Sequence, residues 1–276
     1  MDVCFLYTPA LRIDTLLNKL DSLNADMIVV DLEDSTHKSA KVEAREKILN
    51  FDFTPIIKAG FKLGLRVNCL STFDGIQDLL FIEKLFKSGK AELNHIFVPK
   101  VNHQSEVKVY RSLFETLPVM PKIYTFIETV DAVDNAYDIA KVSDALCFGQ
   151  ADLVAEMYSP NDTFVNYARA RMCIAAAKCN IQAIDSNSFE IEDMDIFLKQ
   201  CMDSKSYGFT GKAAIHPKHI QGINDVFSVK EKTITKYKSS IEKYYGSTTG
   251  FVIEDGEVIA PPFIAKAERM LRLYES

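Results

Sequence analysis

Residues 122–153, KIYTFIETVDAVDNAYDIAKVSDALCFGQADL, largely decide the fold prediction. Two apolar, strand-like runs stand in this stretch, Lys122 to Ile127 and Ala145 to Phe148, and the apolar residues between them recur at helical spacing. Glu128 directly follows the first run, and Asp152 lies shortly after the second. In parallel α/β sheets and barrels, ligands bind at the carboxyl ends of the strands. Two carboxylates at that edge suit Mg²⁺, which takes one or two protein carboxylates and completes its shell with water and substrate.

The same alternation of strand and helix runs through most of the chain. Strands are predicted over residues 3–7, 27–30, 63–67, 95–98, 122–127, 145–148, 181–184 and 213–215. Helices are predicted between them, over residues 11–23, 40–49, 75–86, 104–117, 131–141, 167–179 and 194–207. Eight strands that alternate with helices predict an α/β fold, namely a closed (β/α)8 TIM barrel.

A different pattern begins near Phe227. The segments predicted there are a polar helix over residues 234–245, a hairpin over 251–259 that turns at Asp255-Gly256, and an amphipathic helix over 262–274. These segments come in addition to the eight units of the barrel. We therefore predict a catalytic barrel domain over residues 1–227 and a C-terminal extension over 228–276, which serves as a lid or an oligomer contact.

Composition excludes several classes of protein. With 276 residues, 47% of them apolar and 25% charged, the chain can bury a sizeable core. The formal net charge of −6 argues against nucleic acid as a main partner. No apolar run reaches membrane-spanning length and the first residues lack the layout of a signal peptide, so we expect no membrane partner and a cytoplasmic location. The cysteines show no C-x-x-C spacing, which favours buried free thiols in a reducing compartment.

Most of the predicted strands end in polar or charged side chains, which would lie around one mouth of the barrel. These residues are Asp31, Glu33, Arg66, Asn68, Lys100, Glu128, Asp152 and Asp185. An acid at a strand end can instead cap a helix, because a carboxylate accepts free backbone N–H groups. Capping is our interpretation of Asp185. For Glu128, the presence of Asp152 and Arg66 at the same mouth of the barrel favours metal binding.

Other charged residues have structural interpretations. Arg66 is also placed to form an ion pair with Glu33. Arg169 and Arg171 are interpreted as solvated or interface charges. Gly211-Lys212 alone is too little to predict a phosphate-binding loop.

Segments spread over almost the whole chain resemble the citrate lyase beta subunit and malyl-CoA lyase family, within the HpcH/HpaI aldolase superfamily. In chain order they are MIVVDLED (27–34) with Lys38 and Ala44-Arg45 behind it, LRVN (65–68), HIFVPK (95–100), FIET (126–129), ALCFGQADL (145–153), YARARMCIAAAK (167–178), AIDS (183–186), GFTGKAAIHP (208–217) and DGEVIAPPFIAKAERML (255–271). Each segment alone is a weak signal, whereas the ordered set is a strong one. The resemblance implies a (β/α)8 barrel that uses Mg²⁺ and forms a homotrimer or a multiple of it. It also implies reversible Claisen-type carbon–carbon cleavage, commonly of a hydroxyacyl-CoA.

The resemblance assigns roles to individual residues. The implied catalytic residues are Arg66, Asp31, Glu33 and Asp34; the implied substrate-binding residues are Arg66, Glu128, Lys38 and Asn68; and the implied metal ligands are Glu128 and Asp152. Arg66 matches the arginine that binds the oxo-acid carboxylate, and Lys38 matches a residue near the thioester entry in some members. Cleavage next to a carbonyl generates an enolate, whose charge must be met by preorganised cations. Mg²⁺ supplies a Lewis acid, and arginine supplies a planar fork that suits a carboxylate.

The chain departs from the family pattern at several positions. Val3-Cys4 and Pro9-Ala10 stand where many members have Arg-Ser and Pro-Gly. Ala260 stands where acyl-CoA lyases of this group carry an aspartate contributed by a neighbouring subunit, and alanine has no proton to exchange. Either Asp255 or Glu257 substitutes for it, or the reaction differs. Related class II oxo-acid aldolases carry a histidine base where this chain has Asp34. The chain lacks that histidine, although His37 lies close by in the sequence.

Three functions follow as hypotheses. The first is a Mg²⁺-dependent carbon–carbon lyase of a small hydroxy or oxo acid, with a CoA thioester as co-substrate, similar to citryl-CoA, malyl-CoA or citramalyl-CoA lyases. The second is a CoA-independent 2-oxo-acid aldolase, which Ala260 and the altered first loop favour. The third is a non-catalytic assembly subunit that binds Mg²⁺ and an oxo acid. The acyl group, the oxo acid and the direction of the reaction stay open.

Overall fold

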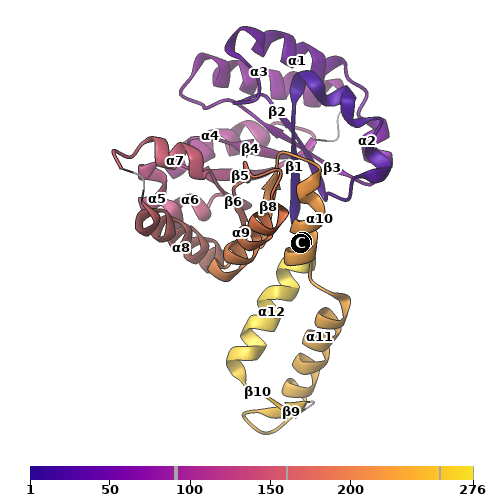
Figure 1. Cartoon of the computed structure of the whole chain (residues 1–276), viewed down its shortest axis with the longest axis vertical. Coiled ribbons are helices and arrows are strands. Elements are labelled where there is room, and N and C mark those ends of the chain that lie inside the picture. The colour runs from indigo at the N-terminus through magenta and orange to yellow at the C-terminus, as the bar shows by residue number, and fades with distance from the viewer. Residues whose placement is uncertain (90–92, 160, 255, 276) are drawn as a thin grey trace. The chain divides into compact units, whose positions relative to one another are not determined.

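The computed structural model describes residues 1–89, 93–159, 161–254 and 256–275. The chain forms two compact units, one over Asp2–Val226 and one over Phe227–Ser276 together with Met1. Figure 1 shows the strands and helices of both units, coloured along the chain.

In the described part of the larger unit, eight parallel strands close into a barrel in chain order. They are β1 (Cys4–Pro9), β2 (Met27–Asp31), β3 (Lys62–Arg66), β4 (Leu93–Val98), β5 (Lys122–Ile127), β6 (Ala145–Phe148), β7 (Gln182–Asp185) and β8 (Gly211–Ala214). Closure comes from the pairing of β8 with β1, which sets Lys212 opposite Cys4. The predicted (β/α)8 TIM barrel is therefore confirmed.

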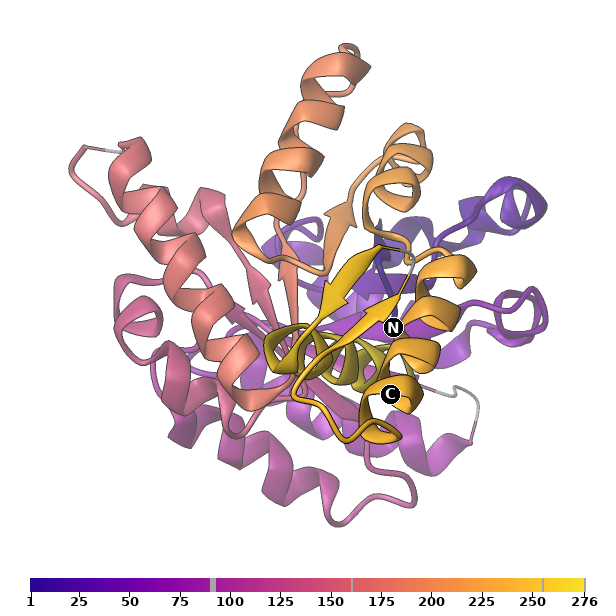
Figure 2. The ribbon, with the colours of Figure 1, turned by 90° about the horizontal axis from the view of Figure 1, so that it is seen from below.

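Helices lie around the outside of these strands (Figure 2). The α-helices are α1 (Lys41–Asn50), α2 (Thr54–Lys58), α3 (Phe73–Ser88), α4 (Gln104–Phe114), α5 (Val130–Asp134), α6 (Ala136–Ala140), α7 (Gln150–Ala155), α8 (Asp162–Cys179), α9 (Met194–Tyr207) and α10 (Lys218–Phe227). The 3₁₀ helices are η1 (Ala10–Leu16), η2 (Leu20–Ser22) and η3 (Lys38–Ala40).

Two predicted helices differ from the structure. The segment predicted as a helix over 11–23 forms the short 3₁₀ helices η1 and η2. Pro9 provides no side-chain cap for η1, and the Thr15 and Ser22 hydroxyls bond to carbonyls of their own turns, at 2.7 and 2.8 Å. Such local bonds compete with a regular α-helix. The helix predicted over 131–141 is interrupted at Asn135, which separates α5 from α6.

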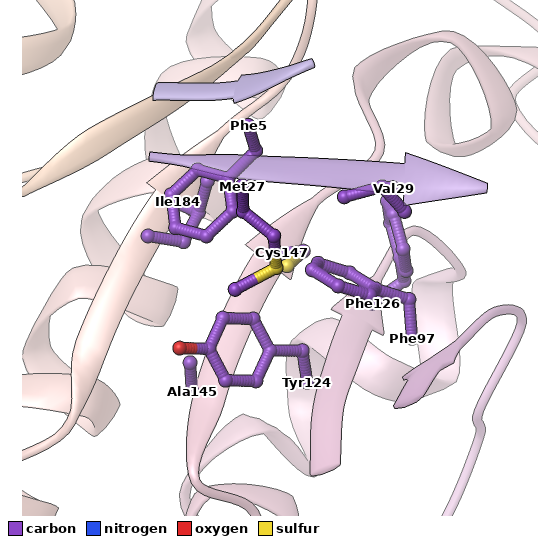
Figure 3. Close-up of a cluster of buried hydrophobic side chains, with 9 residues drawn as sticks. All are labelled: Phe5, Met27, Val29, Phe97, Tyr124, Phe126, Ala145, Cys147 and Ile184. Atoms are coloured by element: carbon purple, nitrogen blue, oxygen red, sulfur yellow. The ribbon is translucent and has the colours of Figure 1, made fainter. Parts of the chain in front are cut away.

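Apolar side chains fill the interior of the barrel (Figure 3). The cluster consists of Phe5, Met27, Val29, Phe97, Tyr124, Phe126, Ala145, Cys147 and Ile184, all nearly inaccessible to solvent. Within a strand these are alternate residues, as expected for side chains that share one face of a pleated strand. Continuing the alternation of β2 and β5 by one step reaches Asp31 and Glu128. The same periodicity that builds the core therefore directs these two carboxylates toward the mouth.

The C-terminal unit contains α11 (Glu231–Tyr245), the antiparallel hairpin of β9 (Val252–Glu254) and β10 (Glu257–Ile259), and α12 (Pro261–Glu275). Glu254 joins the hairpin to α11, because its carboxylate accepts hydrogen bonds from Lys243 at 2.6 Å, from Ser240, and from Ser239 at 2.8 Å. These bonds lower the pKa of Glu254 to about 2. At the predicted turn, Gly256 has a φ of 80°, and Asp255 lies outside the described residues.

Among the helices of the described residues, none combines the length and the apolar character needed to cross a membrane.

Candidate active site

A cavity of about 770 Å³ opens at the carboxyl ends of the strands. Predicted site residues that line it are Asp31, Asp34, Arg66, Glu128 and Asp152. The structure thus brings together side chains that are far apart in the sequence, because they lie at or just after the carboxyl ends of four strands of the same barrel, β2, β3, β5 and β6.

Arg66 and Asp31 form the most regular pair in the site. Nε and Nη2 of Arg66 lie 2.7 Å from Oδ1 and Oδ2 of Asp31, respectively, and Nη1 lies 2.8 Å from Oε2 of Glu33. The guanidinium stands 5.3 Å from the centre of the Tyr7 ring. Burial alone would raise the pKa of Asp31, but Arg66 beside it holds that pKa below its usual value. The predicted ion pair between Arg66 and Glu33 is confirmed, and Asp31 is the stronger partner.

Glu128 directly follows β5 and is only 2% exposed. Its Oε1 accepts a hydrogen bond from the backbone N–H of Lys100 at 2.7 Å. Burial, then the charges of Glu33 and Asp152, raise the pKa of Glu128 to about 8. The cap of the following helix α5 is Thr129, whose hydroxyl accepts from the N–H of Ala132. Glu128 is therefore not used as a helix cap.

Gly149 makes room for Glu128. A Cβ atom on residue 149 would lie 2.1 Å from Oε2 of Glu128 and 2.5 Å from its Cβ, closer than any real side chain packs. The glycine between β6 and α7 is thus required by the close approach of the two loops. Asp152 follows in the first turn of α7, with about a third of its side chain exposed.

Negative charge exceeds positive charge at this end of the cavity. Among the described residues, the five carboxylates Asp31, Glu33, Asp34, Glu128 and Asp152 face the two cationic groups of Arg66 and Lys100. The ammonium of Lys100 stands 3.1 Å from Glu33, 3.3 Å from Asp152 and 3.7 Å from Asp34.

This donor set fits Mg²⁺. Within the described ranges, no group of three His, Cys, Asp or Glu side chains is arranged to hold a metal ion by itself. A hard cation that binds through two carboxylates and takes its other ligands from water and substrate matches both the oxygen donors and the excess negative charge.

Two predicted substrate-binding residues do not line the cavity. Asn68 is buried, and both polar atoms of its side chain have partners: Oδ1 accepts from Lys41 at 2.7 Å, and Nδ2 donates to Asp78 at 2.7 Å. Lys38 begins η3 and is exposed. The Asn68 side chain therefore turns toward α1 and α3. The place of the exposed Lys38 near the thioester entry stays a prediction.

Lys41 is a site-supporting residue that sequence reasoning missed. Its buried ammonium donates to the carbonyl oxygens of Leu32 and Glu33, at 2.6 and 2.7 Å, as well as to Asn68. It therefore ties the acidic loop after β2 to the loop after β3. A lysine at the first position of a helix carries no such signal in the sequence.

A second polar cluster, formed by Asp185, Lys212, Arg169 and Ser204, also borders the cavity. Oδ2 of Asp185 lies 2.5 Å from Nζ of Lys212, 2.5 Å from the Ser204 hydroxyl and 3.3 Å from Nη2 of Arg169. The interpretation of Asp185 as a helix cap was wrong, and so was that of Arg169 as a solvated charge. The available signal was Lys212 itself: a lysine inside a buried strand requires an acid, and Asp185 is its register partner on β7.

The other groups considered as proton carriers are Glu257, Asp255 and His37. The carboxylate of Glu257 pairs with Lys236 at 2.5 Å within the C-terminal unit, and Asp255 lies outside the described residues. The exposed His37 caps η3 by accepting the N–H of Ser39.

The chain is similar to several known proteins. A family model described as HpcH/HpaI aldolase/citrate lyase matches residues 4–217. A (3S)-malyl-CoA thioesterase of Cereibacter sphaeroides is 27% identical over 280 residues, which cover 98% of this chain and 94% of that protein. An L-malyl-CoA/beta-methylmalyl-CoA lyase of Rhodobacter capsulatus is 25% identical over 305 residues, which cover 99% and 94%. The structure of CitE from Mycobacterium tuberculosis in complex with magnesium, acetoacetate and coenzyme A superposes with a TM-score of 0.72 at 20% identity, covering 98% of this chain and 97% of that one. That last likeness bears on the fold alone.

Proposed function

The chain belongs to the HpcH/HpaI aldolase/citrate lyase family, and we propose that it is a Mg²⁺-dependent carbon–carbon lyase that cleaves or forms a small hydroxyacyl-CoA. One observation carries the proposal: a single cavity is lined by an arginine held in a fixed orientation, Arg66, and by an excess of carboxylates that includes Glu128 and Asp152. Relatives named as malyl-CoA lyase and malyl-CoA thioesterase support the substrate class.

Glu128 and Asp152 would hold the metal. When bound, Mg²⁺ supplies a Lewis acid for the carbonyl and carboxylate of a 2-oxo acid. The chain's own contribution is to fix these two side chains: Gly149 leaves the space that Glu128 fills, and α7 carries Asp152 in its first turn.

Arg66 would bind the carboxylate of the oxo acid. Asp31 holds the plane of its guanidinium through two hydrogen bonds, so the remaining N–H groups keep one direction. A fixed cation beside the reacting carbon lowers the energy of the negative charge that develops when the carbon–carbon bond breaks.

The size of the cavity favours a ligand larger than a small acid. A volume of about 770 Å³ lies in the range of sites that enclose drug-sized molecules, so it leaves room for part of a thioester carrier. The homotrimer stays a prediction from the resemblance. The lid or contact role of residues 228–276 and the cytoplasmic location stay predictions from the sequence pattern.

Two other activities have specific support. Hydrolysis of a malyl-CoA-like thioester is favoured by the 27% identity to relatives named thioesterases. A CoA-independent aldolase is favoured by Ala260, which cannot supply the proton expected of the aspartate at that position. The three reactions give different products from the same mixtures, so one experiment separates them.

The test is a mass-spectrometric screen of the full-length protein with Mg²⁺. Acetyl-CoA or propionyl-CoA is combined with glyoxylate, pyruvate or oxaloacetate, and malyl-CoA is supplied alone; EDTA controls accompany each mixture. We expect a new hydroxyacyl-CoA, or cleavage of malyl-CoA to acetyl-CoA and glyoxylate, that disappears with EDTA. Release of free CoA and malate would favour the thioesterase. An adduct formed from free acids would favour the aldolase, and no turnover with intact Mg²⁺ binding would favour the non-catalytic subunit.

A further inference from the structure

Lys100 contacts both of the residues proposed to hold the metal, through two different groups. Its backbone N–H donates to Oε1 of Glu128 at 2.7 Å. Its ammonium lies 3.3 Å from Oδ1 of Asp152 and 3.1 Å from Oε1 of Glu33. We propose that Lys100 is a positioning residue that sets the geometry of these two metal ligands. The inference rests on the proposed metal site.

The backbone of Lys100 is adapted to this double contact. Its φ is 51°, a left-handed conformation that is uncommon for a residue with a side chain. Among the described non-glycine residues, the other positive φ belongs to Asn180, where it ends helix α8 in the usual way. Lys100 ends no helix. Its left-handed turn, directly after β4 and Pro99, presents the N–H to β5 and the side chain to the start of α7.

Lys100 takes one oxygen of each carboxylate. In the described part of the chain, the hydrogen bonds and ion pairs of Glu128 and Asp152 involve Oε1 and Oδ1, both with Lys100. Oε2 and Oδ2 are left for a metal ion. The residue thereby selects which oxygen of each carboxylate a metal ion meets, and it couples the end of β5 to α7.

Glu33 extends the arrangement to the substrate arginine. Lys100 lies beside Oε1 of Glu33, while Arg66 lies beside Oε2, at 3.1 and 2.8 Å. Lys100 is therefore linked through a single carboxylate to the guanidinium proposed to bind the oxo acid. Supporting contacts of this kind commonly change metal affinity or activity by a factor of about 10 to 100 when they are removed.

The effect of the Lys100 charge on metal affinity must be separated from its effect on the geometry of the ligands. Removing a positive charge changes the affinity for any divalent cation by nearly the same factor. Geometry acts differently, because Mg²⁺ demands a near-ideal octahedron with short bonds, whereas Ca²⁺ accepts longer bonds and irregular shells. The ratio of the Ca²⁺ and Mg²⁺ dissociation constants therefore reports how well the two carboxylates are fixed.

The experiment is calorimetric titration of the full-length protein with Mg²⁺ and, separately, with Ca²⁺. Lys100→Met keeps the backbone N–H but loses the ammonium. Lys87→Met is the matched control, because Lys87 pairs with Glu83 on the exposed face of α3. We expect the ratio of the Ca²⁺ to the Mg²⁺ dissociation constant to fall about tenfold in Lys100→Met and to stay unchanged in Lys87→Met.

Equal changes in both affinities, with the ratio preserved, would overturn the positioning role and leave only a charge effect. If thermal melting shows that Lys100→Met does not fold, Lys100→Arg decides the question. It keeps the charge but replaces a compact ammonium by a wider planar group. If Lys100 positions the ligands, the ratio of the Ca²⁺ to the Mg²⁺ dissociation constant should fall in this variant; if only its charge matters, the ratio should stay unchanged. A wild-type protein that binds neither ion would instead remove the metal site on which the inference rests.

Discussion

Arg66 and Asp31 form a bidentate ion pair in which two nitrogens of the guanidinium each lie 2.7 Å from a different carboxylate oxygen. Asp31 also accepts the backbone N–H of Glu33 at 2.9 Å. One carboxylate therefore orients the arginine and shapes the acidic loop at the same time. Because Asp31 is almost fully buried, the pair is shielded from water and keeps its geometry.

Arg66→Lys should retain the metal and lose turnover. An ammonium cannot reproduce the two parallel bonds to Asp31, so the cation no longer points in a fixed direction. We expect kcat/KM to fall roughly 100- to 1,000-fold, equivalent to about 3–4 kcal/mol of transition-state stabilisation. Kinetics and Mg²⁺ titration would be run side by side, with Arg111→Lys, at the ion pair with Asp144, as the control. Near-normal turnover would contradict the role given to Arg66.

Asp152→Asn should abolish Mg²⁺ binding, because one of two ionised oxygen donors is lost. The fold should persist, since Asp152 is partly exposed and its ion pair is with Lys100. Calorimetry would show no heat of Mg²⁺ binding in the variant, and thermal melting would show a change of no more than a few degrees. Asp138→Asn, at an exposed pair with Lys141, serves as the control. Unchanged titration heat in Asp152→Asn would exclude it as a ligand.

The raised pKa of Glu128, about 8, predicts a pH dependence of metal binding. Only the ionised carboxylate binds a cation, so Mg²⁺ affinity should rise by up to tenfold per unit from about pH 6 to pH 8 and then level off. Binding near pH 7 should release about one proton, which calorimetry in buffers of different ionisation enthalpy measures. Affinity that does not change over this range would show that Glu128 is already ionised.

The same pKa fixes the sign of a stability effect in the metal-free protein. A carboxyl whose pKa is higher in the folded than in the unfolded state binds more protons when folded. Its contribution to the free energy of unfolding is complete below about pH 4.5, the ordinary value, and is lost as the pH rises through about 8. Melting temperatures measured without metal should show this decline, and Glu128→Gln should reduce it.

Gly149→Ala should damage the site more than the fold. The added methyl group would lie 2.1 Å from Oε2 of Glu128, so the carboxylate has to move away from the position that faces Asp152. We expect at least tenfold weaker Mg²⁺ binding and a destabilisation of about 1–3 kcal/mol from overpacking. Gly250→Ala is the control, because a Cβ atom there has nothing within 4 Å. Equal metal affinities for the two variants would show that Glu128 adapts.

Apolar periodicity predicted the barrel and the main carboxylates well. The two runs at residues 122–127 and 145–148 coincide with β5 and β6, since a buried parallel strand is a continuous apolar run that ends where solvent begins. Glu128 was found because it follows such a run directly, and Asp152 because it comes shortly after one. A residue's place along a strand is thus readable from local sequence.

The local sequence did not show which partners the side chains at the strand ends would bond to. Asn68 and Asp185 also stand at strand ends, yet Asn68 bonds to Lys41 and Asp78, while Asp185 bonds to Lys212. Those partners lie on other helices and strands. They are distant in the sequence or are brought opposite by the register of neighbouring strands. The pattern around Asn68 carries no information about its pairing, which depends on how the closed barrel packs against its helices. For Asp185 the one signal was Lys212, a lysine inside a buried strand.

The pairing of β1 with β8 sets the order of events during synthesis. Cys4, Phe5 and Leu6 find their partners Lys212, Ala213 and Ala214 only after more than two hundred residues have been translated. A nascent chain that ends after β7 already contains Arg66, Glu128 and Asp152, yet it leaves two strand edges open to aggregation. The capacity to bind a cation should therefore emerge in one step, once β8 has left the ribosome and can pair with β1.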